Sequence, residues 1–253
     1  MIALETRALE KAFGAIHVTQ GVSLAFEQGS RTAIIGPNGA GKTTFFNLLA
    51  GNLHPDSGSI LFEGRDITRL DATSRARVGI SRSFQRNNLF PELTVRENLA
   101  LACALRAGKT RNFWRPMSGL RGVGEEAAEV AARVGLAEAL DAPVRAMSYG
   151  SQRQLEVALA LALKPRVLLL DEPTSGMSPE ETSLMHALLA GLPRTLTVVI
   201  IEHDMDIVLD LADNIVVLDY GRVLEQGPPA AIRASRVVRD RYLGQAPGAG
   251  DAP

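Results

Sequence analysis

A glycine-rich segment near residue 40 has the residue types and the spacing to hold a phosphate chain. It fits the pattern G-x-x-x-x-G-K-[ST] at every fixed position. Glycines let the backbone curl so that successive N–H groups point at phosphate oxygens, and the following helix adds its positive N-terminal dipole. In such a loop the lysine reaches the β- and γ-phosphates, and the threonine hydroxyl binds Mg²⁺. The predicted nucleotide-binding residues are Gly36, Pro37, Asn38, Gly39, Ala40, Gly41, Lys42, Thr43 and Thr44.

The alternative for this segment is a chance match in a glycine-rich turn. Its surroundings favour the phosphate loop. Arg31–Ile35 predicts a strand that enters it, and Thr43–Ala50 predicts a helix that leaves it and ends at Gly51. An acidic pair suited to Mg²⁺ follows a later strand.

That acidic pair is Asp171 and Glu172, which directly follow the apolar run Val167–Leu170. Ligands bind beyond the carboxyl ends of strands in an open parallel sheet, so both carboxylates are expected to face the phosphate site. Successive strand residues point to opposite faces, which predicts different roles. Asp171 fits the Mg²⁺ shell, and Glu172 fits a general base that orients water. A solvated acidic turn is the alternative, and the preceding aliphatic run counts against it.

His203 follows a second apolar run, Thr197–Ile201, which places it at the same predicted sheet edge. There it would be in reach of the γ-phosphate. A hydrogen-bonded structural histidine fits the sequence equally well. The candidate catalytic residues are therefore Glu172 and His203.

The elements expected to position these residues form an α/β fold. Alternating apolar residues predict antiparallel strands at Ile2–Leu9, Val22–Phe26 and, as an edge strand, Ser59–Phe62. Uninterrupted apolar runs, as at Val167–Leu170 and Thr197–Ile201, are typical of a parallel sheet buried on both faces. The order strand, Asp219-Tyr220-Gly221, strand predicts a hairpin of Ile215–Leu218 and Arg222–Glu225.

A helical region interrupts these strands. Residues rich in Ala, Leu, Glu and Arg favour helix at Leu99–Arg106, Gly124–Val134 and Gln152–Leu163. We therefore predict a single domain over residues 1–244, with a core of 1–85 and 164–244 and an inserted helical subdomain at about 86–163. Residues 245–253 are mostly Gly, Ala and Pro, which predicts a disordered tail.

Composition limits the classes of function. The 253 residues carry a net charge of −1, so no basic field is present to hold nucleic acid. A single cysteine, Cys103, predicts a reducing, cytoplasmic setting. The amino terminus does not read as a signal peptide, and the longest apolar stretch, Val157–Leu163, is far short of the roughly 20 residues that span a bilayer. Any role at a membrane must then come through a partner.

A further segment, Ser148-Tyr149-Gly150-Ser151-Gln152, precedes a predicted helix and the Asp-Glu strand. It resembles a variant of the signature motif of ABC-type ATPases, and the similarity extends from about Leu4 to Gly244. The resemblance implies an ABC ATPase fold: a P-loop NTPase core with a mixed sheet, an antiparallel β edge and an inserted helical subdomain. It also implies that the cofactors are ATP and Mg²⁺. By resemblance, Phe13 stacks on adenine, His203 is the switch histidine, and Gln85 is the Q-loop residue that joins Thr43 and Asp171 at the metal.

Such ATPases pair head to tail, as homo- or heterodimers, with ATP held between one chain's phosphate loop and the other chain's signature segment. The resemblance therefore implies that Ser148 and Gly150 present a hydroxyl, N–H groups and a helix N-terminus to the partner's γ-phosphate. A plain helix cap by Ser148 is compatible with the same role. Ser178 stands where many members of the family have aspartate, which leaves the communication of that loop across the dimer open.

Within the family, the chain is most similar to the ATP-binding subunits of branched-chain amino-acid importers. The residues that carry this similarity are Gly79–Gln85, Leu89–Asn98, Tyr242–Gly244 and the connection containing Phe113-Trp114-Arg115. The resemblance implies permease subunits as partners, a solute-binding protein as an indirect one, and a peripheral place on the inner face of the cell membrane. Urea-uptake and lipopolysaccharide-export ATPases look similar over much of the same sequence. A non-transport ABC protein is a further alternative, as is a GTP-type switch.

The connection at Gly108–Gly124 has two interpretations. Phe113 and Trp114, with the neighbouring arginines, could touch lipid headgroups or a permease loop. A packed aromatic corner with solvated arginines is the alternative.

Overall fold

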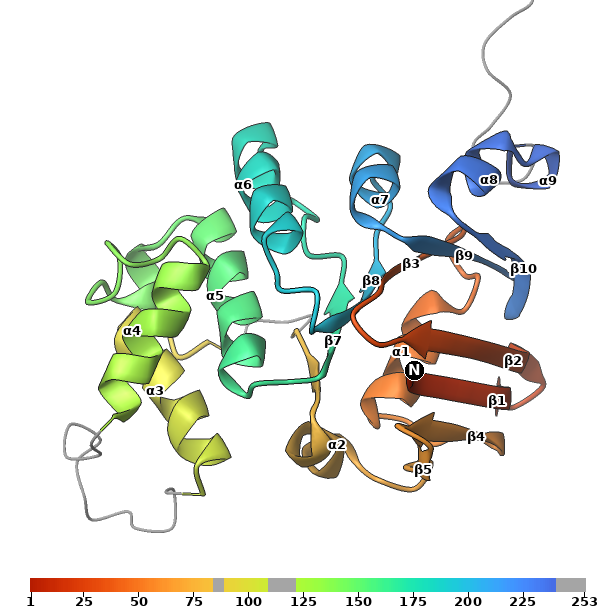
Figure 1. Cartoon of the computed structure of the whole chain (residues 1–253), viewed down its shortest axis with the longest axis horizontal. Coiled ribbons are helices and arrows are strands. Elements are labelled where there is room, and N and C mark those ends of the chain that lie inside the picture. Colours follow the sequence, from red (N-terminus) through yellow and green to blue (C-terminus); the bar gives the residue numbers. More distant parts are fainter. Residues whose placement is uncertain (84–88, 109–121, 240–253) are drawn as a thin grey trace, which may run out of the picture.

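A computed structural model describes residues 1–83, 89–108 and 122–239. Its centre is a six-stranded sheet with the order β10-β9-β3-β8-β7-β6 (Figure 1). The strands are β3 Arg31–Ile35, β6 Ile80–Arg82, β7 Val167–Asp171, β8 Thr197–Ile201, β9 Asn214–Asp219 and β10 Arg222–Gly227. Neighbours pair in parallel except β9 and β10, which form the predicted hairpin. The α/β fold with a mixed sheet is confirmed.

Burial on both faces explains the uninterrupted apolar runs. Every residue of β3, β7 and β8 is buried. In β7, Val167 and Leu169 join one hydrophobic core, whereas Leu168 and Leu170 join the core on the other face. A strand with a core on each side has no position left for a polar residue until it ends.

A second, four-stranded antiparallel sheet lies over one face, with the order β2-β1-β4-β5. Its strands are β1 Ile2–Phe13, β2 Ile16–Glu27, β4 Ser57–Phe62 and β5 Arg65–Asp66. The prediction of β4 as an edge strand is wrong, because β5 pairs with it. Glu63 and Gly64 form the connecting turn, both with positive φ (48° and 78°), which is the backbone of a tight two-residue hairpin.

Helix α1, Lys42–Ala50, packs in the core that the two sheets share. Its carboxyl end is held by Arg75, a fully buried residue of α2, Ala72–Val78. The Arg75 guanidinium donates hydrogen bonds to the carbonyls of Leu48 and Leu49 in the last turn of α1, and to those of Ile67, Thr68 and Leu70. Burial lowers the pKa of Arg75 to about 10, so it remains a cation at neutral pH. The helix that begins at the phosphate loop is thus fixed from its far end.

The opposite face of the six-stranded sheet is covered by α6, Pro179–Ala190, and α7, Met205–Leu211 (Figure 1). Two short helices, α8 Pro229–Ala234 and α9 Arg236–Val238, complete this layer. No helix in the described ranges is both long and apolar enough to cross a bilayer.

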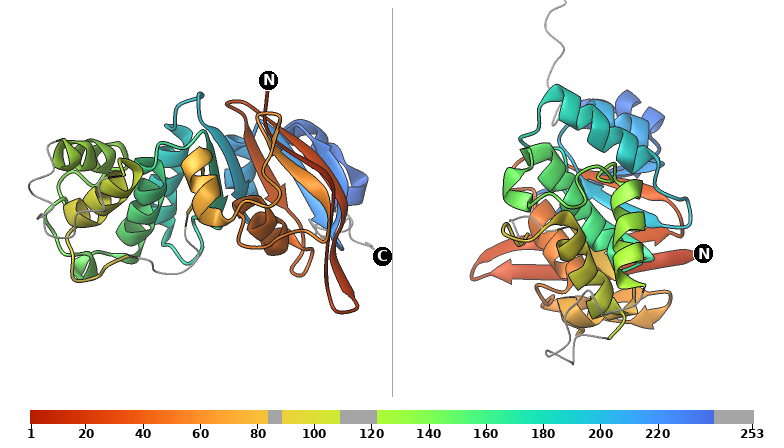
Figure 2. Two further views of the ribbon diagram at one scale, coloured as in Figure 1. Left: turned by 90° about the horizontal axis from the view of Figure 1, so that it is seen from below. Right: turned by 90° about the vertical axis from the view of Figure 1, so that its left-hand side faces the viewer.

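The helical subdomain has a core of its own, formed by α3 Val95–Arg106, α4 Val123–Arg133 and α5 Tyr149–Ala162. Figure 2 shows it at one end of the elongated molecule, with the antiparallel sheet toward the other. Helix α3 starts earlier than the predicted Leu99, because Thr94 and Glu97 form a capping box. The predicted Q-loop residue Gln85, the Phe113-Trp114-Arg115 connection and the tail at 245–253 lie outside the described residues.

Candidate functional site

The phosphate loop joins β3 to α1, and its glycines are required by close backbone approaches. Gly36 has φ +149°, and a Cβ there would lie 2.1 Å from the Leu218 carbonyl oxygen. Gly41 has φ +97°, and a Cβ there would lie 2.4 Å from the Val18 carbonyl oxygen. Any larger residue at either position would push the loop away from the strands beneath it.

The start of α1 is open to an anion. Gly41 caps the helix without a side-chain hydrogen bond, and the first turn carries no acidic residue. The helix N–H groups and the helix dipole therefore face outward with no carboxylate of the first turn to balance them. The loop itself is held by the β9–β10 turn, where the Gly221 N–H donates to the Ala40 carbonyl at 2.9 Å. This arrangement fits a phosphate cradle, the term used below for the loop and the first turn of α1.

Lys42 lies folded against the loop that precedes it. Its Nζ donates to the carbonyl oxygens of Gly36 at 2.7 Å and Pro37 at 3.0 Å, and the residue is only 6% exposed. Burial lowers the pKa of Lys42, while the negative charges of Glu172 and Asp171 act against that shift. The two carboxylates thus share an electrostatic environment with the Lys42 ammonium, as predicted for one sheet edge.

Asp171, the last residue of β7, is a buried carboxylate with one oxygen engaged. Its Oδ2 accepts a hydrogen bond from Arg82 Nη2 at 2.6 Å, and Arg82 also donates to Asn47 Oδ1 at 2.5 Å. Within the described residues, Asp171 Oδ1 has no hydrogen-bond partner although it is buried. Burial raises the pKa of Asp171, and the Arg82 charge opposes the increase. An unpartnered buried carboxylate oxygen beside a phosphate cradle fits the chemistry of Mg²⁺, a hard cation that binds oxygen.

Glu172 lies just outside β7, in a left-handed backbone conformation with φ +47°. Its N–H donates to the Ile201 carbonyl of β8 at 2.9 Å. The prediction that Asp171 and Glu172 point to opposite faces of one strand is therefore wrong, because β7 ends at Asp171 and Glu172 lies beyond it. The two carboxylates nevertheless differ in surroundings, since Asp171 is buried and Glu172 is half-exposed.

His203 and Glu172 form a direct pair. His203 Nε2 lies 2.5 Å from Glu172 Oε1, and both side chains are partly exposed. A carboxylate held by an imidazole N–H is oriented, which suits a base that must position water. The structure therefore brings together Lys42, Asp171, Glu172 and His203 from three strand ends.

Two residues of this site were missed from the sequence, Arg82 and Glu202. Glu202 is 3% exposed, and its Oε1 accepts hydrogen bonds from Thr174 N at 3.1 Å and Thr174 Oγ1 at 2.5 Å. Its Oε2 accepts from His203 N at 3.0 Å. Glu202 thereby joins the His203 segment to the loop that follows Glu172. A charged residue directly after the apolar run Thr197–Ile201 was the available signal.

The signature segment lies at the start of α5, away from the phosphate cradle. Ser148 caps the helix by accepting from Ser151 N at 3.2 Å, as predicted. Tyr149 Oη donates to the Ser175 carbonyl at 3.2 Å, and Gln152 Nε2 donates to the Met147 carbonyl at 3.2 Å. These bonds join the segment to its own helix and to the loop after β7.

Phe13 lies at the tip of the β1–β2 hairpin and is 49% exposed. Lys11 Nζ lies 5.7 Å from its ring centroid. Phe13 pairs with Ile16, and β2 reaches the phosphate loop at Val18, where it approaches Gly41. The exposed ring is therefore carried by the hairpin that borders the cradle.

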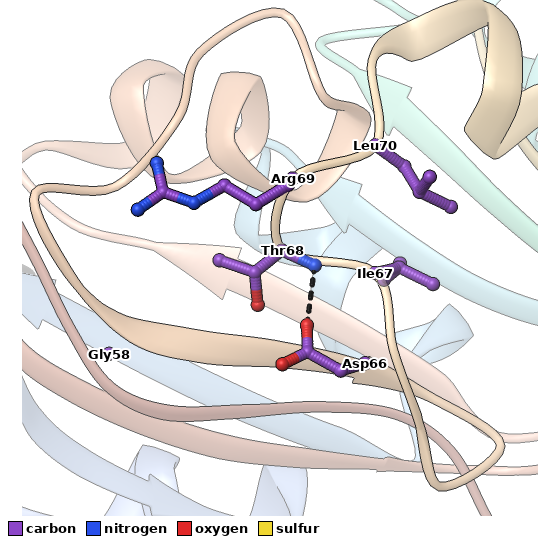
Figure 3. A pocket seen from close by; sticks show the side chains of 6 residues that line it. All are labelled: Gly58, Asp66, Ile67, Thr68, Arg69 and Leu70. Carbon is purple, nitrogen blue, oxygen red and sulfur yellow. Dashed lines mark hydrogen bonds between the residues drawn. The ribbon is translucent and has the colours of Figure 1, made fainter.

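A surface cavity of about 390 Å³ opens elsewhere, beside β5 (Figure 3). Asp66 Oδ1 accepts from Thr68 N at 2.8 Å, and Thr68 Oγ1 accepts from Ile60 N at 2.9 Å. None of its lining residues belongs to the cradle or the signature segment: Gly58, Asp66, Ile67, Thr68, Arg69 and Leu70.

The chain is similar to known proteins over the residues described above. A family model described as ABC transporter matches residues 19–175. The high-affinity branched-chain amino acid transport ATP-binding protein BraF of Pseudomonas aeruginosa is 40% identical, over 96% of this chain and 98% of BraF. A crystal structure of a nucleotide-free ATP-binding cassette from an ABC transporter has a TM-score of 0.84 at 29% identity, covering 97% of this chain and 100% of that one. A dimeric post-hydrolysis cassette bound to ADP and Pi has a TM-score of 0.75 at 26% identity, covering 89% and 98%.

Proposed function

The chain belongs to the ABC transporter family and is an ATP-binding cassette ATPase, and we propose that it energises the import of branched-chain or other amino acids through a separate membrane permease. The observation that carries the proposal is the meeting of Lys42, Asp171 and the Glu172–His203 pair beside the glycine cradle. The similarity to BraF along nearly the whole of both chains supports amino acids as the solute class.

The phosphate-binding residues would hold the nucleotide. Lys42 and the N–H groups at the start of α1 bind the β- and γ-phosphates, and Phe13 stacks on the adenine ring. Thr43, Gln85 and the free Oδ1 of Asp171 would hold Mg²⁺. When bound, Mg²⁺ neutralises charge that develops on the phosphate oxygens.

The catalytic pair would act on water. The Glu172 carboxylate orients the attacking water and accepts its proton. His203 holds that carboxylate through the 2.5 Å contact and would also meet the γ-phosphate. Glu202 fixes the backbone of His203 and so keeps the pair in position.

Hydrolysis is proposed to need a dimer, with a second copy or with a sister ATPase. Ser148 and Gly150 of each chain would complete the phosphate site of the other; within their own chain both donate hydrogen bonds to Glu181. Closing and opening of this dimer would drive the permease. The chain would then sit on the cytoplasmic face of the cell membrane, held by the permease, with a solute-binding protein delivering amino acid from outside.

Purification of the tagged chain from membrane extracts of its host tests the transport role. We expect permease subunits to copurify. Vesicles reconstituted with the complex should take up radiolabelled leucine only when Mg-ATP is present on the side of the membrane that carries this chain. Vesicles carrying Glu172→Gln serve as the matched control and should lose uptake. Copurification of a lipid-export or urea-uptake assembly would overturn the amino-acid assignment and leave the ATPase assignment intact.

A further inference from the structure

The N-terminus of α5 is occupied by a carboxylate that comes from another helix. Glu181 Oε1, in the first turn of α6, accepts hydrogen bonds from the Gly150 N–H and the Ser148 hydroxyl, both at 2.9 Å. Its other oxygen, Oε2, accepts from the Ser178 N–H at 3.1 Å. The first turn of α5 has no acidic residue of its own, so Glu181 supplies negative charge at this helix start.

The fit of Glu181 in this position is close. A Cβ on Gly150 would lie 2.5 Å from the Glu181 carboxyl carbon and 2.5 Å from Oε1, so the glycine is what allows the carboxylate to approach. The hydrogen bonds from Ser178, Ser148 and Gly150 lower the pKa of Glu181, which is therefore ionised at neutral pH. An anion in van der Waals contact with a helix N-terminus is the arrangement that a bound phosphate would adopt.

We propose that Glu181 is an internal competitor for the partner chain's ATP: its carboxylate occupies the donors of Ser148 and Gly150 until the partner's γ-phosphate displaces it. This inference rests on the proposed head-to-tail dimer. Each donor has one hydrogen to give, so neither can serve both anions at full strength. An undisplaced Glu181 would also repel the incoming phosphate, because both carry negative charge.

Displacement would change the loop that follows the catalytic pair. Glu181 is the capping-box partner of Ser178, and that bond involves the other carboxylate oxygen. Glu181 can therefore leave α5 while α6 remains capped. The loop between Glu172 and Ser178 would keep one link to the signature segment, the bond from Tyr149 to Ser175. Binding of the partner's nucleotide would thus break the contacts of Glu181 with Ser148 and Gly150. The signature segment would then be less tightly joined to the loop that starts at Glu172.

The test compares two neighbouring glutamates of α6. Glu180 is exposed, and its side chain accepts hydrogen bonds from the Ser178 hydroxyl, at 2.9 Å, and from its own backbone. Glu181→Gln and Glu180→Gln remove the same charge, and glutamine can still cap α6. Each is combined with Glu172→Gln, so that ATP is not consumed, and dimerisation with Mg-ATP is measured by sedimentation.

Glu181→Gln should tighten the ATP-dependent dimer about tenfold at each of its two sites, hence about hundredfold in Kd, whereas Glu180→Gln should leave Kd within about twofold. Equal Kd values for the two variants, with equal unfolding temperatures, would make Glu181 a helix cap and nothing more. A weaker dimer for Glu181→Gln would also overturn the inference. If the Glu172→Gln chain itself stays monomeric with Mg-ATP, a homodimer is excluded and the same Kd comparison is made with a copurified sister ATPase. If the chain pairs with neither, the proposed pairing is wrong and the inference falls with it.

Discussion

Two helix N-termini of this molecule are proposed to meet phosphate, and they differ in what the chain itself puts there. At α1 the glycine cradle has no side-chain cap and no acidic residue in the first turn, so its donors face a ligand. At α5 the donors of Ser148 and Gly150 are already bound by Glu181. One site is ready in the isolated chain, whereas the other must first give up an internal partner.

This difference between the two helix N-termini would separate ATP binding from ATP hydrolysis. If the proposed sites are correct, the open N-terminus of α1 would hold a triphosphate in the isolated chain. The occupied N-terminus of α5 would make hydrolysis depend on another chain. The link between them is short, because the loop after Glu172 leads to Ser178 and α6, which carries Glu181.

Removing the proposed base, Glu172, should have the largest effect, and it should change hydrolysis at the α1 site without changing the contacts of α5. Glu172→Gln should slow ATP hydrolysis by about 10²–10⁴-fold, the usual contribution of a positioned base, and leave ATP binding intact. Steady-state phosphate release and equilibrium ATP binding measure the two quantities. Turnover near that of the parent chain would remove Glu172 from catalysis, and Glu180→Gln is the matched control.

Substituting one residue at each of the two helix N-termini should distinguish these sites by their effect on ATP affinity. Lys42→Ala should weaken ATP binding to the isolated chain about 10–100-fold, because it removes hydrogen bonds to a charged ligand worth about 1.5–3 kcal/mol. Ser148→Ala should leave that affinity within about twofold and lower turnover instead. Calorimetric titration gives the affinities, and unfolding temperatures check the loss of the Ser148 cap. Equal losses of affinity in both variants would contradict the comparison.

Breaking the Glu202 contacts should have a smaller effect, felt on the catalytic pair. Glu202→Ala leaves the N–H groups of Thr174 and His203 without their acceptor, which should lower the free energy of unfolding by about 1–3 kcal/mol. The released His203 segment should reduce turnover about tenfold, equivalent to about 1.4 kcal/mol in the barrier. Glu202→Gln keeps one acceptor oxygen and should fall between parent and alanine variant. Turnover unchanged in both would show that His203 needs no such support.

Changing pH should have the smallest effect, and on the α5 side it should have none near neutrality. The pKa of Glu181 lies below its ordinary value of 4.5, so the carboxylate is charged in both folded and unfolded chains at pH 6–8. Its contacts with α5 are lost only as the pH falls through the lowered pKa of Glu181, which is well below pH 6. The ratio of dimer Kd between Glu181→Gln and Glu180→Gln, each with Glu172→Gln, should stay constant from pH 6 to 8. A ratio that varies across this window would assign the difference to another titrating group.

Elements with a strong local pattern were predicted closely from the sequence. The strands Arg31–Ile35 and Thr197–Ile201 have the predicted bounds, because both are apolar runs buried on two faces. The phosphate loop followed from its glycines and lysine. The late start predicted for α3 and the edge position predicted for β4 were errors of local reading, since the Thr94–Glu97 capping box and the Glu63-Gly64 turn are both visible in the sequence.

Contacts between distant residues were not predicted. Arg82 meets Asp171 across 89 residues, Glu202 meets Thr174 across 28, and Glu181 meets Gly150 across 31. No propensity or periodicity specifies such pairs, because each depends on how strands are ordered in the sheet and how helices pack on it. The pattern Ser178-x-x-Glu181 marks Glu181 as a capping-box residue of α6, but it does not indicate the contact with Gly150.

By itself, then, the sequence predicted a glycine-rich loop before a helix, a carboxylate pair at a strand end and a second helix start capped by serine, and the structure has all three. Backbone geometry and residue type are enough for these, since glycine, lysine and a capping serine act locally. Only the tertiary structure decided which of the two helix N-termini is open. That depends on the packing of α6 against α5, which brings a negative charge to one N-terminus and leaves the other to a ligand.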